Sequence, residues 1–212
     1  APIAPMLAQT AADVSDAFEQ LDGEADFEWK MDGARIQVHK DGDAIHIYTR
    51  TGNEVTAAIP EIVETVRQLD APTLILDGEA ISMTSDGRPH PFQITMRRFG
   101  RKLDVDALRA ELPIQAFFFD CLYREGVSIA DRPTRERIAA LAEVVPPALQ
   151  VPRLITRSLE EAQAFYEAAI AAGHEGLMAK ALDAPYEAGN RGASWLKIKR
   201  THTLDLVVLA AE

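Results

Sequence analysis

Apolar and polar positions alternate with two different periods along this chain, which predicts strands mixed with helices. Residues 35–40 and 44–50 place an apolar side chain at every second position, and that period is typical of strands with one buried face. Between them, Asp41-Gly42 is a signal for a two-residue hairpin turn of type I′, in which both central residues need positive φ. The sequence therefore predicts an antiparallel hairpin here.

Helical spacing, with apolar residues three and four positions apart, recurs elsewhere. The predicted helices are residues 10–21, 60–69, 104–112, 134–145 and 159–172. Short apolar runs bounded by turn residues predict further strands at residues 27–30, 73–83, 114–123, 151–156, 176–180, 194–200 and 204–209. Hairpins mixed with scattered helices favour an α+β fold with mainly antiparallel sheets over a doubly wound parallel fold.

Composition limits the class of protein. With 212 residues, 47% hydrophobic and 26% charged, the chain is large enough to bury a core and is typical of one globular domain or a closely packed pair. No apolar run approaches the roughly 18 residues that span a bilayer. The single Cys121 excludes an internal disulfide framework and a multi-cysteine zinc site, and it fits the reducing cytoplasm.

The segment with the clearest chemistry is KMDGAR at residues 30–35, which lies between two predicted strands. It places an amine, a carboxylate and a guanidinium around a glycine that lets the backbone approach a ligand. A lysine amine attacks phosphorus only when it is unprotonated, and nearby cations or partial burial lower its pKa from an ordinary value of about 10.4. For so short a motif, a charged surface hairpin is the competing interpretation.

The chain resembles the covalent nucleotidyltransferases, the family that comprises ATP-dependent DNA ligases, RNA ligases and mRNA capping enzymes. The KMDGAR segment is similar to the first motif of that family, K-x-D-G-x-R. Five further segments resemble later motifs in the family's order: YTRTG at 48–52, LDGEA at 76–80, FFFD at 117–120, EGLMAK at 175–180 and WLKIK at 195–199. Each match alone is weak, but six ordered matches over most of the chain are highly specific.

The resemblance implies roles for individual residues. Lys30 is the implied nucleophile, which attacks the α-phosphate of ATP, forms a lysine-AMP phosphoramidate and releases pyrophosphate. Glu175 is the implied carboxylate at an Mg²⁺ site, with Asp32 as a less direct contributor. The implied ATP and AMP contacts are Glu28 at the adenine amino group, Glu79 at the ribose hydroxyls, Phe119 on the adenine face, and Arg35, Arg50, Arg191, Lys197 and Lys199 at ribose and phosphate.

Structural interpretations compete with several of these roles. Three consecutive phenylalanines on a strand belong first of all to the core, and only Phe119 is expected to touch a ligand. Asp77 and Asp120 also fit structural turn or cap carboxylates. Standing alone, Glu175 would fit a solvated loop charge, and Lys180 would fit support of the sheet. The histidines show no paired metal spacing and receive no role.

Within the family, bacterial or archaeal ATP-dependent DNA ligases are the branch that the chain resembles. The segments FQITMRRFGRK at 92–102 and FFDCLY at 118–123 carry this likeness. Arg35 closes the first motif where NAD-dependent ligases usually have alanine, which implies ATP. The implied enzyme passes AMP to the 5′-phosphate of nicked double-stranded DNA, and the 3′-hydroxyl then seals the nick, in replication, repair or recombination. An RNA ligase or capping-type guanylyltransferase is the alternative, as is a non-catalytic nucleotide-sensing or DNA-binding module.

The resemblance also implies a domain organisation. Residues 1–205 are expected to form the adenylation domain, and residues 206–212 the start of a truncated C-terminal OB-fold. That OB-fold and a helical N-terminal DNA-binding domain of the same enzyme are the expected partners. Without them, the chain is expected to bind ATP or retain AMP on Lys30 but to seal nicks poorly. A monomer in the cytoplasm, associated with the nucleoid, is expected.

The net charge of −11 would ordinarily argue against a nucleic-acid partner. The charge is unevenly distributed, however, because residues 1–29 contain acidic side chains but no Lys or Arg, whereas residues 88–109 are locally basic. The candidate DNA-backbone contacts in this basic segment are Arg97, Arg98, Arg101 and Lys102, and a solvated basic face is the alternative. Contact with DNA is therefore expected to be local.

Overall fold

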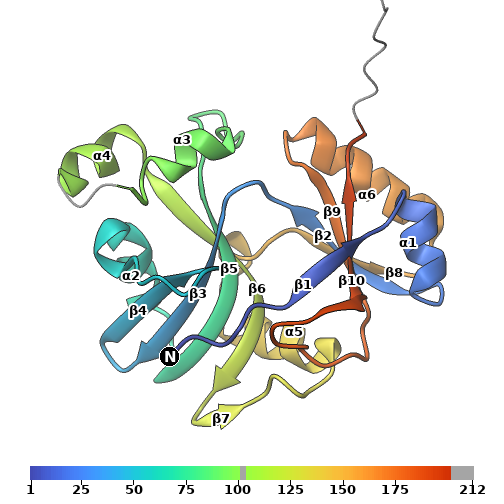
Figure 1. Ribbon diagram of the computed structural model, residues 1–212, viewed down its shortest axis with the longest axis horizontal. Helices are drawn as coiled ribbons and strands as arrows, with labels where there is room; N and C mark the ends of the chain where they lie inside the picture. Colours follow the sequence, from blue (N-terminus) through green and yellow to red (C-terminus); the bar gives the residue numbers. More distant parts are fainter. Residues whose placement is uncertain (101–103, 202–212) are drawn as a thin grey trace, which may run out of the picture.

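The computed structural model describes residues 1–100 and 104–201, and it contains two five-stranded sheets that form two lobes (Figure 1). In spatial order, the first sheet consists of β1 (Leu7–Thr10), β10 (Arg191–Lys199), β9 (Gly176–Lys180), β2 (Ala25–Lys30) and β8 (Arg153–Thr156). The second consists of β4 (Ala44–Thr49), β3 (Ala34–Asp41), β5 (Thr73–Ser82), β6 (Ile114–Arg124) and β7 (Val127–Ser128). Among these strands only β1 and β10 pair in parallel. The predicted α+β fold with mainly antiparallel sheets is confirmed.

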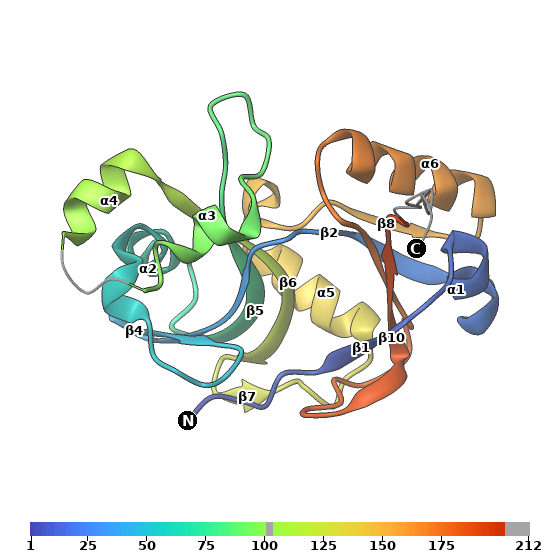
Figure 2. The same cartoon turned by 45° about the horizontal axis from the view of Figure 1, so that its top comes forward.

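Helices cover one face of each sheet (Figure 2). The first sheet carries α1 (Val14–Gln20) and α6 (Leu159–Ala171), and the second carries α2 (Pro60–Arg67) and α5 (Thr134–Val144). The shorter elements are α3 (Phe92–Met96), α4 (Val105–Glu111) and the 3-10 turns η1 (Thr56–Ala58) and η2 (Pro147–Leu149). Side-chain caps define two helix starts, since Asp13 accepts from the backbone of α1 and Ser158 from that of α6. None of the helices in the described ranges has the length and apolar composition needed to cross a membrane.

Alternation along the strands separates a core face from a site face. In β2, Phe27 is buried among the side chains that pack against α1 and α6, so its neighbours Glu28 and Lys30 point to the opposite face of the sheet. In β6, Phe118 is buried with the helices of the second sheet, which turns Phe119 to the other face. The two site faces meet across a small cluster of buried side chains, namely Met6, Leu122, Tyr186 and Trp195.

The predicted hairpin is confirmed, but the predicted turn type is wrong. The ladder between β3 and β4 ends at the pair Asp41 and Ala44, so the two central turn residues are Gly42 and Asp43. Gly42 has a φ of +57°, whereas Asp43 is not among the residues with positive φ. A type I′ turn needs positive φ at both positions, and the register is therefore shifted by one residue from the prediction.

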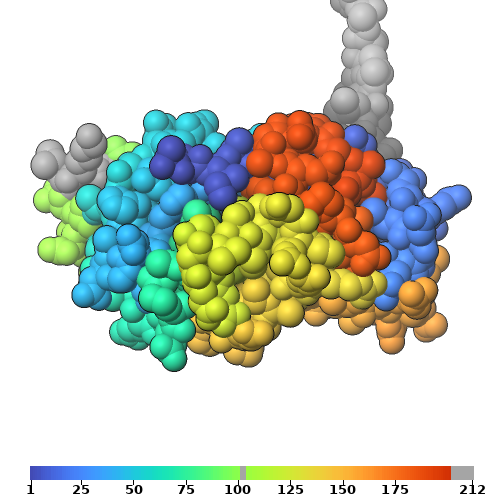
Figure 3. Space-filling model, turned by 90° about the horizontal axis from the view of Figure 1, so that it is seen from below, coloured from blue at the N-terminus to red at the C-terminus, as the bar shows by residue number. Residues whose placement is uncertain are grey.

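Five short elements were missed by the sequence pattern: β1, α3, β7, η1 and η2. Each is too short to show a period, and β1 exists because its backbone pairs with β10. The first ten residues thereby run from the second lobe to the edge of the first sheet. Figure 3 shows this N-terminal segment, in dark blue, lying between the cyan surface of the second lobe and the orange-red surface of the first. The predicted strand 204–209, like the boundary at residue 205, lies outside the described residues.

Candidate functional site

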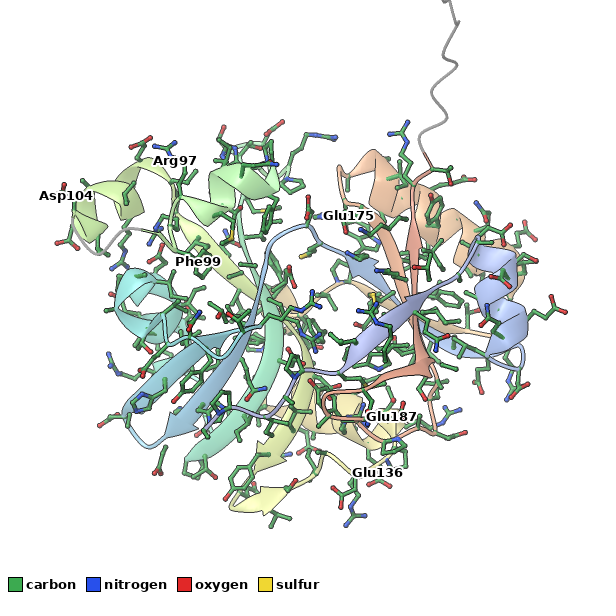
Figure 4. All side chains as sticks on the ribbon, in the orientation of Figure 1. Arg97, Phe99, Asp104, Glu136, Glu175 and Glu187 are labelled. Carbon is green, nitrogen blue, oxygen red and sulfur yellow. The ribbon has the colours of Figure 1, made fainter. Side chains whose placement is uncertain are left out.

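The centre of the site is an ion pair between Lys30 at the end of β2 and Glu175 just before β9. The backbones of the two segments also pair, because Glu175 N donates to Lys30 O at 3.0 Å. Figure 4 shows Glu175 beside the connection that leads from β2 to β3. The side chain of Lys30 is 21% exposed and that of Glu175 is 24% exposed. The pair is therefore held in place but open to a ligand.

Two more carboxyl groups belong to this region. Burial, followed by the negative charge of Glu175, raises the pKa of Asp32. Burial likewise raises the pKa of Glu79 to about 8, although the positive charges of Lys30 and Arg35 oppose the shift. Oε1 of Glu79 accepts a hydrogen bond from Gly33 N at 3.2 Å. Gly33 must be a glycine here, since a Cβ would collide with the carbonyl oxygen of Ala80.

Positive side chains gather around the same ion pair. Nζ of Lys199 lies 3.8 Å from Oε1 of Glu175, and Lys197 shares its face of β10 because alternate residues do so. The pKa of Lys197 is lowered by burial and then by the positive charges of Lys199, Arg191, Lys30 and Arg50. The structure therefore brings these five predicted cations into one electrostatic neighbourhood, which suits a polyanionic ligand.

Glu28 lies two residues before Lys30 and is 2% exposed. Its Oε1 is 2.8 Å from Nζ of Lys180, and its Oε2 is 2.9 Å from Nη2 of Arg153. Burial alone would raise the pKa of Glu28, but the charges of Lys180 and Arg153 outweigh burial and bring it to about 2. Glu28 is therefore an ionised, buried hydrogen-bond acceptor at neutral pH, and Lys180 supports it.

Phe119 presents its ring beside this buried carboxylate. The Lys180 ammonium lies 4.5 Å from the ring centroid, and Trp195 packs against the ring edge-on with centroids 6.1 Å apart. The carbonyl oxygen of Phe119 accepts from Nη2 of Arg153 at 3.1 Å. The predicted aromatic residue and the predicted acceptor thus lie next to each other, as an aromatic and polar base-binding pocket requires.

Arg35 is largely committed to contacts within the protein. It donates to Asp77 at 3.0 and 2.7 Å, to the hydroxyl of Tyr186 at 3.1 Å and to Met6 O at 2.5 Å. Four hydrogen bonds leave one of the five guanidinium N–H groups for a ligand. A cavity of about 270 Å³ opens beside Arg35 and is lined also by Arg50 and the N-terminal residues. Arg50 is accordingly the more available of the two arginines.

Asp77 and Asp120 have structural partners, but they lie within β5 and β6 and not at turns or caps as predicted. Asp77 accepts from Arg35 and, at 2.7 Å, from Tyr186. Asp120 forms a buried two-point pair with Arg137, with distances of 2.9 and 3.2 Å. Both carboxylates have hydrogen-bond partners within the protein, and they hold the second sheet to its surroundings.

The prediction that Arg98 contacts DNA is wrong. Arg98 is 1% exposed, and its guanidinium pairs with Glu61 and donates to the carbonyl oxygens of Leu112 at 2.7 Å and Ala58 at 3.2 Å. A side chain enclosed in this way cannot reach a phosphate. Arg97 is exposed and pairs with Glu111 at 3.1 Å, and Figure 4 shows it at the edge of the molecule. Arg101 and Lys102 lie outside the described residues.

Two carboxylates, Glu175 and Asp32, are the predicted metal-site residues. In the part of the chain that the structure describes, no group of three or more His, Cys, Asp or Glu side chains is arranged to hold a metal ion. Glu175 and Asp32 nevertheless interact closely enough for one charge to raise the pKa of the other carboxyl group. Mg²⁺ usually takes one or two carboxylates together with water and substrate phosphate, so these residues fit that ion.

Comparison with known proteins places the chain in a family. The family model described as ATP dependent DNA ligase domain matches residues 5–199. The chain belongs to this family. A probable DNA ligase from Anaeromyxobacter dehalogenans (strain 2CP-C) is 62% identical over the whole chain, and one from Mycobacterium avium (strain 104) is 54% identical. The chain spans 41% and 40% of these two relatives, so it corresponds to less than half of their length.

Solved structures of DNA ligases have the same architecture. The ligase domain of M. tuberculosis LigD is 28% identical with a TM-score of 0.73, and the match covers 93% of this chain and 60% of that one. A mycobacterial DNA ligase D complexed with ATP and MES is 27% identical with a TM-score of 0.69, at the same coverage. A Chlorella virus DNA ligase-adenylate, at 16% identity and a TM-score of 0.66, shares the fold. The predicted nucleotidyltransferase fold of the DNA ligase adenylation domain is confirmed.

Proposed function

We propose that this chain is the adenylation domain of a longer ATP-dependent DNA ligase and that Lys30 carries AMP as a covalent intermediate. The observation that supports the proposal most directly is the position of the Lys30 amine, which faces Glu175 with Lys197 and Lys199 close by. A lysine with a purely structural role would not require two further lysines close to its amine. A nucleophile that attacks a triphosphate does, because the cations offset the charge that develops on the phosphate oxygens.

The chemistry proceeds by one substitution at phosphorus. The amine nitrogen of Lys30, once it has lost a proton, forms a bond to the α-phosphorus while the bond from that phosphorus to the pyrophosphate oxygen breaks. Glu175 orients the amine, and Lys197, Lys199, Arg191 and Arg50 hold the phosphates. Positioning and electrostatic stabilisation account for most catalysis of this type.

The nucleoside end of ATP is assigned to the other half of the site. Glu28 accepts from the adenine amino group, Phe119 stacks on the base, and Glu79 accepts from the ribose hydroxyls. Arg35 contributes its one remaining N–H and otherwise fixes Asp77. Glu175 and Asp32 would hold Mg²⁺, which when bound offsets the charge of the triphosphate.

The complete enzyme would pass AMP to the 5′-phosphate of a DNA nick and seal the nick with the 3′-hydroxyl. Residues 1–205 are assigned to the adenylation domain and residues 206–212 to the start of an OB-fold. Nicked double-stranded DNA is the partner, with Arg97, Arg101 and Lys102 as candidate backbone contacts. A monomer in the cytoplasm, associated with the nucleoid, is the form expected.

Intact mass measured with and without ATP and Mg²⁺ tests the mechanism. The expected result is a mass increase of one AMP on the wild-type chain and no increase on Lys30→Ala, with Lys40→Ala as a control that keeps the adduct. An adduct that survives Lys30→Ala, or GTP labelling in place of ATP labelling, would contradict the proposal. Nicked DNA and nicked RNA tested side by side distinguish a DNA ligase from an RNA ligase.

A further inference from the structure

A row of four buried charges crosses the first sheet beneath the proposed adenine site. Asp26 and Glu28 alternate on one face of β2, Arg153 reaches them from β8, and Lys180 reaches Glu28 from β9. Nε of Arg153 is 3.0 Å from Oδ1 of Asp26, and its Nη2 is 2.9 Å from Oε2 of Glu28. The side chain of Arg153 is 12% exposed, and those of Asp26, Glu28 and Lys180 are 2% or less.

Arg153 connects the two groups that would contact the base. The same Nη2 that pairs with Glu28 also donates to the carbonyl oxygen of Phe119, at 3.1 Å. Its planar fork therefore fixes the carboxylate on β2 relative to the aromatic residue on β6, and thus one sheet relative to the other. A lysine could supply the charge but not this geometry, because an ammonium group has no planar fork.

The network leaves Glu28 able to accept but unable to donate. An ionised carboxylate offers about four lone-pair sites, and Lys180 and Arg153 occupy one on each oxygen. The remaining sites suit an N–H donor. The amino group at position 6 of adenine is such a donor, whereas the oxygen at position 6 of guanine is an acceptor and would be repelled.

The pKa values of the two acids are shifted in opposite directions. Burial, and then the negative charge of Glu28, raises the pKa of Asp26 well above its ordinary range, and its Oδ2 has no hydrogen-bond partner among the described residues. Arg153 meets Asp26 through Nε and Glu28 through Nη2, so the two carboxylates share one guanidinium. Asparagine has the shape of a neutral aspartic acid, so Asp26→Asn offers a matched control.

We infer that Arg153 is a positioning residue that sets the selectivity of the site for a 6-aminopurine, by holding Glu28 as a fixed acceptor beside the ring of Phe119. This inference rests on the proposed function, since it assumes that the base of ATP lies against Glu28. In this scheme Arg153 acts through Glu28 and through the carbonyl oxygen of Phe119. Stability alone does not require such a network, because well-packed apolar residues can replace buried ion pairs at little cost.

The test compares ATP with purine riboside 5′-triphosphate, which lacks the 6-amino group, by calorimetric titration of the folded chain. The wild type is expected to prefer ATP by at least about tenfold, the range for a hydrogen bond to a charged acceptor. In Arg153→Gln the preference is expected to fall toward unity because ATP binds more weakly while the analogue is unaffected. Arg153→Lys should retain part of the preference, and Asp26→Asn should retain all of it.

Circular dichroism and thermal unfolding of each variant separate selectivity from folding. If Arg153→Gln lowers the melting temperature but keeps the wild-type preference, Arg153 is structural only and the inference is overturned. The Lys variant, which keeps the positive charge, carries the test if the Gln variant does not fold. Absence of ATP binding and of a Lys30 adduct in the wild type would overturn the proposed function itself, which is a different outcome.

Discussion

At the scale of single residues, the site contains two glutamates whose pKa values are shifted in opposite directions by their surroundings. Glu28 has its pKa lowered to about 2 and Glu79 has its pKa raised to about 8, although both are glutamates within the same small region. The difference arises because two cations in direct contact outweigh burial at Glu28, whereas burial outweighs the charges of Lys30 and Arg35 and the hydrogen bond from Gly33 at Glu79. Environment, and not residue type, assigns the charge.

The raised pKa of Glu79 predicts a pH-dependent loss of stability. Below its ordinary pKa of 4.5, the carboxyl group is neutral in both folded and unfolded chains. As the pH rises from 4.5 to about 8, the unfolded chain loses the proton that the folded chain keeps, so folding becomes less favourable. Glu79→Gln removes this effect and should be more stable than the wild type above pH 8, by up to a few kcal/mol because each pKa unit is worth about 1.4 kcal/mol.

Urea unfolding of the two proteins at pH 5 and pH 9 measures the effect. The exposed Glu19 on α1 provides a control, since Glu19→Gln should follow the wild type at both pH values. A constant difference in unfolding free energy between Glu79→Gln and the wild type would show that Glu79 does not hold a proton in the folded chain.

At the scale of elements, the sequence predicts most strands and most helices, because Ile36 and Val38 or Phe27 and Trp29 keep a period that local packing preserves. It misses the short strands β1 and β7. It does not predict α3, whose five residues are shorter than two helical turns. The buried role of Arg98 was also missed, since a run of basic residues has the same composition whether its members are exposed or enclosed. Its partner Glu61 is 37 positions away, and only the fold brings the two together.

Sequence separation also explains which site residues could be predicted from the sequence. Lys30, Glu79 and Glu175 belong to recognisable motifs, and the structure brings them together as expected. Arg153 belongs to none of these motifs, and its acidic partners are 125 and 127 positions away. One signal was available: Asp26 and Glu28 alternate with buried positions in β2, and two buried acids need a cation from elsewhere.

Arg98 joins the elements around α2, and its removal should be costly. Its guanidinium connects Glu61 on α2, the carbonyl of Ala58 in η1 and the carbonyl of Leu112 that precedes β6. Arg98→Ala would leave Glu61 partly buried without its cation, and breaking such a pair costs about 3–5 kcal/mol. Arg97→Ala, one residue earlier but exposed, should change the unfolding free energy by less than about 1 kcal/mol. Chemical denaturation measures both, and equal losses would contradict the assignment.

At the scale of the whole molecule, the net charge of −11 conceals a strongly uneven distribution. Positive side chains meet at Lys30, Lys197 and Lys199, while α1 and the chain before β2 carry acidic groups. A domain of this kind binds a polyanion only where its cations gather, because screening removes the effect of more distant charges over about 8–10 Å.

Among the candidate DNA contacts that the structure describes, Arg97 is exposed and Arg98 is buried, although Arg97 also pairs with Glu111. Each phosphate neutralised by a protein cation contributes about one to the slope of log affinity against log salt. Arg97→Gln should therefore reduce that slope for nicked DNA by about one, measured by fluorescence anisotropy over a salt series. Arg157, also exposed but in the first lobe, is the control, and Arg157→Gln should leave the slope unchanged. Equal effects from both variants would mean that binding follows net charge alone.

The connection between β2 and β3, residues 31–33, joins the two sheets directly beside the proposed nucleophile. Lys30 ends a strand of one sheet, and Glu79 lies in the other. The nucleotide proposed to bind both residues would therefore connect the two lobes and restrict their relative motion. Its triphosphate would be held mainly by one lobe, and its ribose by the other. Release of pyrophosphate would then preserve this connection between the lobes, because AMP remains attached to one lobe by a covalent bond and to the other through its sugar.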